Sequence, residues 1–212
     1  MHHDPERDLA LAYAPDDGRR AGLSALLALD AALGDVVRST TQPALGQIRL
    51  AWWREQLVKL DRAEPPAMPV LQALAAQVLP LGVGGAELAT IVDGWDVLIE
   101  DEDLADPALD RFAAERGGRL FALAAKFLGG DLAKAQRLGR GWALFDLARH
   151  QSDPKIAARA DALAAEVLAG TLGGVARPLG MLALSARLEL AGVPQGGPKR
   201  AARLMWFGLA GR

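Results

Sequence analysis

The chain contains 212 residues, of which 51% are hydrophobic, and it carries a formal net charge of −2 with no cysteine. The nearly neutral charge gives no overall field that would attract nucleic acid or an anionic membrane, so we expect no nucleic-acid partner. The lack of cysteine excludes disulfides and thiol chemistry. The length suits one large domain or two small ones, and we treat residues 1–212 as a single all-helical domain.

Two features bear on the compartment. The first residues, MHHDPERDL, are charged and lack the apolar region of a secretory signal peptide. The most apolar long window, residues 162–184, is interrupted by Glu166 and Arg177, which is not typical of a membrane span. We therefore expect a cytoplasmic protein whose contact with a membrane is at most peripheral.

Alanine and leucine dominate the chain, and no alternating strand pattern is visible, so the sequence favours helices throughout. Proline and glycine divide it into segments. A short helix is expected after Pro5. The further helices are expected at about 17–37, 43–61, 70–79, 86–99, 108–128, 132–150, 155–169, 174–190 and from 198 onward. The Gly117-Gly118 pair is a weak point of the helix expected at 108–128. The acidic run 100–103 is typical of a solvated loop.

The segment LGQIRLAWWREQLVKL, residues 45–60, has two neighbouring apolar stripes at helical spacing. One stripe consists of Leu50, Trp53, Leu57 and Leu60, and the other of Leu45, Ile48 and Trp52. Together they form an arc of roughly 200°, which is wider than a surface helix needs. We therefore expect both tryptophans in the core.

Arg49 and Gln56 fall between these stripes, whereas Arg54 points away and is expected at the surface. A guanidinium turned toward a core needs an anionic partner, because it cannot deprotonate there. That partner is either a carboxylate of this chain or a bound anion such as a diphosphate. Asp30 lies inside the apolar arc of helix 17–37, while Asp35 lies outside it, so we expect Asp30 and Arg49 to meet in the interior.

Helix 132–150 places Leu138, Trp142 and Phe145 on one face, which Arg149 continues one turn later. Arg149 either joins a site or extends to water near the helix end, where its charge complements the helix dipole. Asp146 lies at the edge of this face and could serve Arg149. His150 has no partner spaced for metal binding or nucleophilic chemistry.

The last helix, PKRAARLMWFGLAGR, mixes basic and aromatic residues. Such a helix either lies on a membrane surface or closes the bundle. It mixes Lys199, Arg200 and Arg203 with Leu204, Met205, Trp206 and Phe207. The chain has no phosphate-binding glycine loop and no signature of zinc proteases or serine hydrolases.

The stretch PALGQIRLAWWRE, residues 43–55, resembles the EP-x-LGEIRL-x-WWRE segment of the squalene/phytoene synthase family. That segment is found in a proteobacterial branch similar to a mitochondrial respiratory complex I assembly factor. The opening DPERDLALAYAPDDGRRAGLSALLALDA, the central DGWDVL and FAAERGGRLFALAAKFLGG, and the closing RAARLMWFGLAGR also resemble the family. The resemblance implies an all-α antiparallel bundle of the isoprenoid-synthase type, with about nine to ten helices.

Active members of this family join two prenyl diphosphates, using Mg²⁺ held by two facing D-x-x-x-D motifs. Carboxylates four residues apart share a helix face and can chelate such a cation. By the resemblance, the first motif falls here at Gly34 and Arg38, and the second near Ser152 and Ile156. Phe145 and Ala148 stand where active members carry Gln and Asn. The resemblance therefore implies a catalytically degenerate member with no metal site.

Three functions remain open at this point. The first is a non-catalytic relative that binds a prenyl diphosphate or lipid, or a protein partner, with a respiratory-assembly role among the options. The second is an active synthase with rearranged ligands, which alone would require Mg²⁺, and the third is a helical domain unrelated to isoprenoids. The catalytic residues stay unknown, with Asp30 and Asp35 as candidates. The ligand-binding candidates are Arg38, Arg49, Trp53, Gln56 and Arg149.

Overall fold

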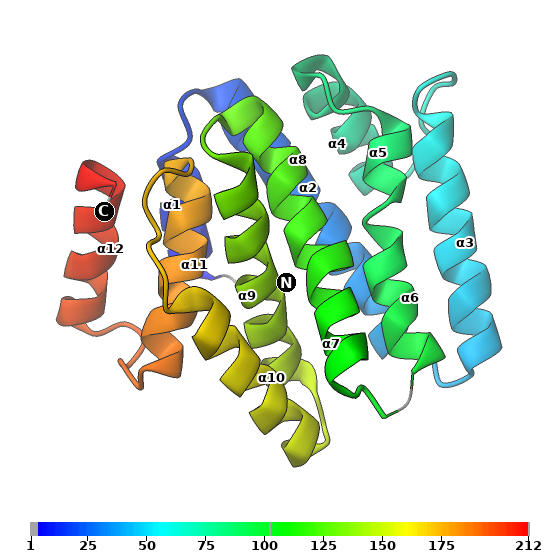
Figure 1. The fold of residues 1–212 in the computed structure, drawn as a ribbon. Coiled ribbons are helices and arrows are strands. Elements are labelled where there is room, and N and C mark those ends of the chain that lie inside the picture. Colours follow the sequence, from blue (N-terminus) through cyan, green and yellow to red (C-terminus); the bar gives the residue numbers. More distant parts are fainter. Residues whose placement is uncertain (1–3, 102, 212) are drawn as a thin grey trace.

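The computed structural model describes residues 4–101 and 103–211, and over these residues the chain forms an all-α fold without β-strands (Figure 1). The N-terminal half contains α1 (Pro5–Ala12), α2 (Asp17–Arg38), α3 (Pro43–Lys59), α4 (Pro69–Gln77), a 3₁₀ turn (Leu79–Leu81), α5 (Gly85–Ala89) and α6 (Val92–Glu100). The remainder contains α7 (Asp106–Phe112), a π-helical turn (Ala113–Gly118), α8 (Arg119–Leu128), α9 (Leu132–His150), α10 (Pro154–Leu168), α11 (Arg177–Leu190) and α12 (Pro198–Ala210).

Local sequence signals explain where most helices begin. Proline occupies the first helical turn of α1, α3, α4, α10 and α12, where its missing N–H costs no hydrogen bond. Aspartate caps several N-termini by accepting hydrogen bonds from the first free N–H groups, and the caps are Asp4, Asp16, Asp131 and Asp153. The predicted helices 17–37, 132–150 and 155–169 are thus confirmed within one residue.

Two predicted helices are interrupted. The segment predicted as 86–99 is divided between α5 and α6, and the segment predicted as 108–128 changes from α to π geometry and back. The π-helical turn covers the Gly117-Gly118 pair, so the glycines mark a change in helical geometry rather than a break. The helix predicted from 174 begins later, at Arg177, because Pro178 fits best in a first turn.

Figure 1 shows α3 at one edge of the bundle and α12 at the opposite edge, with α8 and α9 between them. The long α9 packs against the π-helical turn, α8, α10 and α11, and α2 packs against α3, α4, α6 and α8. No helix among the described residues has the length and apolar content needed to cross a bilayer.

The position of α3 corrects one prediction. Its inner stripe, with Leu50, Trp53 and Leu57, is buried, but the second stripe is on the surface. Ile48 is 64% exposed and Trp52 is 38% exposed. The expectation that both tryptophans lie in the core was therefore wrong for Trp52, which packs edge-on against the Trp53 ring with centroids 5.6 Å apart.

Candidate functional site

A cavity of about 360 Å³, here called the central cavity, opens between α2, α6, α9 and α11 beside the first turn of α1. Its apolar walls include Leu27, Trp95, Trp142, Phe145 and Leu182. A hollow of about 160 Å³ shares Arg38, Arg116, Asp146 and His150 with it. The charged and polar lining side chains are Asp4, Arg7, Asp30, Arg38, Arg116, Asp146, His150 and Ser185. The lining mixes polar and apolar surface in about equal measure, and polar groups that converge beside aromatic walls are a feature of ligand sites.

Arg116 connects the two long helices that face each other across this cavity. Its guanidinium donates from Nε and Nη2 to the two carboxylate oxygens of Asp30 on α2, at 2.8 and 2.7 Å. Nη2 also donates to Oδ2 of Asp146 on α9, at 2.6 Å. Asp30 is buried as expected. The prediction that it pairs with Arg49 was wrong, because its partner is Arg116.

The surroundings of Arg116 keep its guanidinium protonated. The side chain is buried, and its Cζ lies 4.2 Å from the centre of the Trp95 ring and 5.1 Å from that of Trp142. Burial alone would lower the pKa of Arg116, but the attraction of Asp30 and Asp146 outweighs it and raises the pKa above its ordinary value. The cluster therefore contains a fixed cation between two carboxylates.

The backbone around Arg116 has little free space. Arg116 belongs to the π-helical turn, a rare geometry that recurs at functional sites. A Cβ on Gly94 of α6 would lie 2.4 Å from the Arg116 backbone nitrogen, and one on Gly117 would lie 2.0 Å from the Gly139 carbonyl oxygen of α9. Glycines at these points let three helical segments approach closely enough to place the guanidinium between α2 and α9.

Arg38 lines the central cavity from α2, one helical turn beyond Gly34 and two beyond Asp30. A Cβ on Gly34 would lie 2.8 Å from Nη1 of Arg38 and 2.9 Å from the Trp95 ring. The space that a side chain would need at position 34 is thus filled by the guanidinium and the indole. Asp35 is exposed and accepts a hydrogen bond of 2.7 Å from Arg38 at the outer surface.

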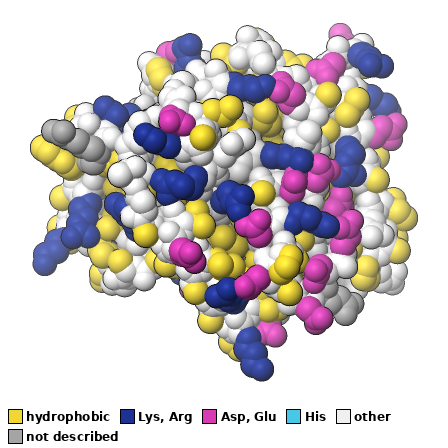
Figure 2. Space-filling view, in the orientation of Figure 1, with side chains coloured by type: hydrophobic (Ala, Val, Ile, Leu, Met, Phe, Trp, Pro, Cys, Tyr) yellow, Lys and Arg dark blue, Asp and Glu magenta, His cyan; other side chains and the backbone are white. Residues whose placement is uncertain are grey.

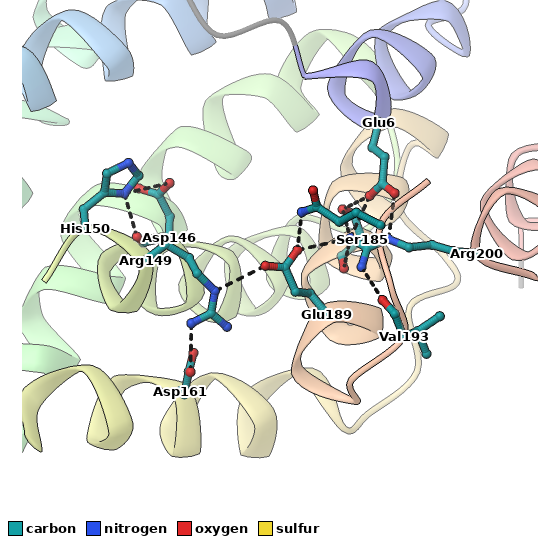
Figure 3. Close-up of polar contacts among 10 residues, drawn as sticks. Glu6, Asp146, Arg149, His150, Asp161, Ser185, Glu189, Val193 and Arg200 are labelled. Carbon is teal, nitrogen blue, oxygen red and sulfur yellow. Dashed lines mark hydrogen bonds and ion pairs between the residues drawn. The ribbon is translucent and has the colours of Figure 1, made fainter. Parts of the chain in front are cut away.

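On the opposite wall, α9 presents Asp146 and His150, which are four residues apart and share a face. Nδ1 of His150 lies 2.9 Å from the Asp146 carbonyl oxygen and 3.6 Å from its Oδ1, as Figure 3 shows. Asp146 therefore serves Arg116 and His150, and not Arg149 as the helical pattern had suggested.

Arg149 is directed at the neighbouring helices. Its Nη1 donates to Asp161 of α10 at 2.9 Å and its Nε to Glu189 of α11 at 3.4 Å (Figure 3). The guanidinium also lies over the Phe145 ring, with Cζ 4.6 Å from the ring centre. These contacts tie α9, α10 and α11 together beside the central cavity.

The predicted residues on α3 lie elsewhere. Arg49 is exposed and donates to the hydroxyls of Ser39 and Thr40, at 3.1 and 2.7 Å, after the end of α2. Trp53 is buried and Gln56 is half-buried, and neither belongs to the cavity lining given above. Their role in ligand binding stays a prediction.

Arg54, expected as ordinary surface, is part of an ion-pair network with α6 and α8. Its Nη2 donates to Asp93 and Asp96, each at 2.7 Å, and Arg119 also pairs with Asp93. Burial raises the pKa of Asp93, but the hydrogen bonds from Arg54 and Arg119 outweigh it, so this pKa is lowered overall. For Asp96 burial prevails, and its pKa is raised.

The Mg²⁺ that active members of the resembled family use does not fit these residues. Asp30 and Asp146 face each other from α2 and α9, but both accept hydrogen bonds from Arg116, and Gly34 offers no donor atom. Within residues 4–101 and 103–211, no three His, Cys, Asp or Glu side chains form a metal-binding group. A hard cation would have to displace a guanidinium held by two carboxylates.

Arg116 is the site residue that sequence analysis missed. Its partners Asp30 and Asp146 lie 86 and 30 residues away, so no local spacing connects the three. The only signal was the glycine pair that follows it in AAERGG, which now corresponds to the π-helical turn.

Comparison with known proteins provides one match. The family model described as squalene/phytoene synthase matches residues 1–153 of this chain. Neither a curated protein nor a solved structure matches it significantly. The matched segment includes α2, the π-helical turn and α9, which carry Asp30, Arg116 and Asp146. Because the match spans well over half of the sequence, the chain belongs to the squalene/phytoene synthase family.

Proposed function

We propose that this protein is a non-catalytic member of its family that binds an isoprenoid with an anionic head group in the central cavity, without a metal ion. The observation that carries the proposal is Arg116, whose guanidinium bonds to the two carboxylates that face each other across the cavity. An internal cation thus already neutralises the two carboxylates that α2 and α9 present to the cavity, so they are not free to hold Mg²⁺.

The cavity lining supports the ligand class. Trp95, Trp142 and Phe145 offer apolar surface for a hydrocarbon chain, while Arg38 and His150 provide positive or hydrogen-bonding groups. Arg116 bonds to Asp30 and Asp146 through Nε and Nη2, and these two carboxylates already offset its charge, which makes it a poor group to hold a phosphate. We assign the phosphate contact to Arg38, whose guanidinium lines the cavity and has one exposed carboxylate partner, Asp35.

The experiment is calorimetric titration of the protein with farnesyl diphosphate, in EDTA and in Mg²⁺, with diphosphate release measured in the same samples. We expect binding in EDTA and no release under either condition. Arg38→Ala should weaken binding by about tenfold, since a charge-assisted hydrogen bond is lost. Arg20→Ala is the matched control, because Arg20 lies on the same helix and pairs with Asp17 at the surface.

Release of diphosphate that requires Mg²⁺ would contradict the proposal and establish the alternative, an active head-to-head synthase. Failure to bind farnesyl diphosphate in EDTA, together with equal behaviour of both arginine variants, would exclude the ligand-binding function.

A protein-binding function, such as the respiratory-assembly role, is a second candidate, and the exposed stripe Leu45, Ile48 and Trp52 on α3 favours it. Captured partners from source cells should be compared between the parent protein, Ile48→Glu and the control Glu55→Lys on the same helix. Loss of one identified respiratory subunit or assembly factor in Ile48→Glu alone would support this function. An unchanged set of captured proteins would contradict it.

A further inference from the structure

The C-terminal helix α12 is held firmly on the bundle by Arg200. Although it belongs to a basic segment, this side chain is only 1% exposed. It donates to both carboxylate oxygens of Glu6 on α1, at 2.6 and 2.8 Å, and to the Val193 carbonyl oxygen at 2.8 Å, as Figure 3 shows. Leu204 and Phe207 continue the buried face. The outer face of α12 therefore keeps a fixed orientation.

The outer, solvent-facing side of α12 carries large apolar side chains. Met205 is 50% exposed, Trp206 65% and Leu209 71%. With about 100° per residue, these three side chains share one side of the helix, and Lys199 and Arg203 follow directly beside Trp206. A contiguous exposed apolar patch marks an interaction site more often than scattered single residues do.

Arginine side chains without carboxylate partners among the described residues lie next to this apolar patch. A groove between α11 and α12 is lined by Arg187, Arg203 and Trp206, together with Leu184, Leu188, Ala191, Ala202 and Phe207. Within the described part of the chain, Arg187 and Arg137 donate only to backbone carbonyl oxygens, and Arg203 forms no ion pair. Burial, with Arg137 and Arg203 nearby, lowers the pKa of Arg187.

α11 and α12 themselves provide no free acidic side chain to offset these cations. α12 contains no acidic residue, and Glu189, the only one in α11, is engaged by Arg149 and Arg200. On the face shown in Figure 2, Lys and Arg side chains stand alone at the α12 edge, whereas acidic and basic side chains mix in the centre and at the right. The surface around α11 and α12 is thus locally basic, although the net charge of the chain is −2.

From this arrangement we infer that the outer face of α12 docks the protein on an anionic lipid bilayer, with Met205, Trp206 and Leu209 entering the interface and Arg187, Lys199 and Arg203 contacting lipid head groups. Tryptophan prefers the membrane interface, and each basic residue near an anionic leaflet adds to the attraction. A helix with an apolar strip and a basic flank lies in the plane of such an interface. The inference does not depend on what the central cavity binds.

The test is flotation of the full protein with vesicles of phosphatidylcholine alone or of equal parts phosphatidylcholine and phosphatidylglycerol, neither containing an isoprenoid. We expect binding to the anionic vesicles only, weakened by salt. Trp206→Ser and Arg203→Glu should each reduce binding about tenfold or more. Trp52→Ser is the matched control, because Trp52 is an exposed tryptophan at the opposite edge of the bundle.

Three results would overturn the inference. They are failure of the parent protein to float with anionic vesicles, equal binding to neutral vesicles, or an equal loss with Trp52→Ser. Thermal melting of each variant verifies folding, and exposed Trp206 and Arg203 should leave the midpoint unchanged. If only soluble proteins, and no vesicles, bind the patch, the lipid assignment is wrong.

Discussion

The Arg116 guanidinium donates two parallel hydrogen bonds to the Asp30 carboxylate across 86 residues of sequence, beside the rings of Trp95 and Trp142. A buried ion pair of this kind contributes little relative to a well-packed apolar pair, because both groups lose their hydration. Breaking it from one side is different, since the remaining charge is left buried without a partner. The pair therefore specifies how α2, the π-helical turn and α9 meet more than it adds net stability.

We predict that Arg116→Met lowers the free energy of unfolding by about 3–5 kcal/mol, because Asp30 is left buried and charged. Combining it with Asp30→Leu should cost less than the sum of the two single changes. Urea denaturation of the four proteins measures the coupling. The pair Asp30→Ala and Arg49→Ala should instead be additive, since Arg49 contacts Ser39 and Thr40. Additive effects for Asp30 and Arg116 would contradict the buried pairing.

The two adjacent glycines of the π-helical turn should respond in opposite ways to alanine. A Cβ at position 117 would overlap the Gly139 carbonyl oxygen at 2.0 Å, whereas one at 118 would meet nothing closer than 3.4 Å. Gly117→Ala is therefore expected to destabilise by about 2 kcal/mol or more. Gly118→Ala should be neutral or should stabilise by up to about 1 kcal/mol, because alanine favours helical backbone. Thermal melting distinguishes the two, and equal effects would contradict the close contact.

On α3, the burial pattern predicts contrasting effects at two neighbouring apolar positions. Leu50→Ala should cost about 2–5 kcal/mol, because Leu50 is fully buried and its truncation leaves a cavity. Ile48→Ser should change the free energy of unfolding by less than about 0.5 kcal/mol, since that side chain is already mostly in water. Chemical denaturation measures both. A large loss in Ile48→Ser would show that the outer stripe is covered in solution.

Asp93 and Asp96 share Arg54, yet their pKa values shift in opposite directions. A lowered pKa in the folded state means that ionised Asp93 stabilises the fold above the unfolded-state pKa of about 3.9, and that this contribution is lost as pH falls through the folded value. Asp93→Asn should thus lower the melting temperature at pH 7, and the difference from the parent should shrink as the pH falls below about 4.

The raised pKa of Asp96 has the reverse sign. Its stabilising contribution exists below the unfolded-state pKa and is lost as pH rises through the folded value, so its ionised form is a cost at neutral pH. Asp96→Asn should therefore leave the melting temperature at pH 7 unchanged or raise it. Melting curves recorded from pH 3 to pH 7 on both variants test the pair, and a larger loss for Asp96→Asn than for Asp93→Asn would contradict the assignment.

Most helix positions could be predicted because their signals are local. Proline in a first turn and aspartate at a cap act within three or four residues, so α2, α9 and α10 were located closely. The broad apolar arc of α3 did not reveal which half faces water. That depends on α3 lying at the edge of the bundle, with neighbouring helices on one side only.

The candidate site depends on long-range pairing, which periodicity does not contain. The apolar arc of α2 correctly placed Asp30 in the interior, but several arginines could have been its partner. Arg49 had a similar apolar setting in sequence, whereas Arg116 lies in a segment whose π geometry changes which residues share a face. The burial of Arg200 could not be predicted for the same reason. A basic terminal helix suggests exposed side chains, and its partner Glu6 lies 194 residues away.

The π-helical turn at Ala113–Gly118 places one extra residue in a continuous helix, and this has a consequence for how the cavity can change. Deleting a single residue there would restore α geometry and rotate the preceding side chains by about 100° relative to those that follow. One three-nucleotide deletion would thus turn the guanidinium away from Asp30 and expose two facing carboxylates. The polarity of this cavity is set by helical phase, and a change of one codon in length could reverse it without any new charged residue.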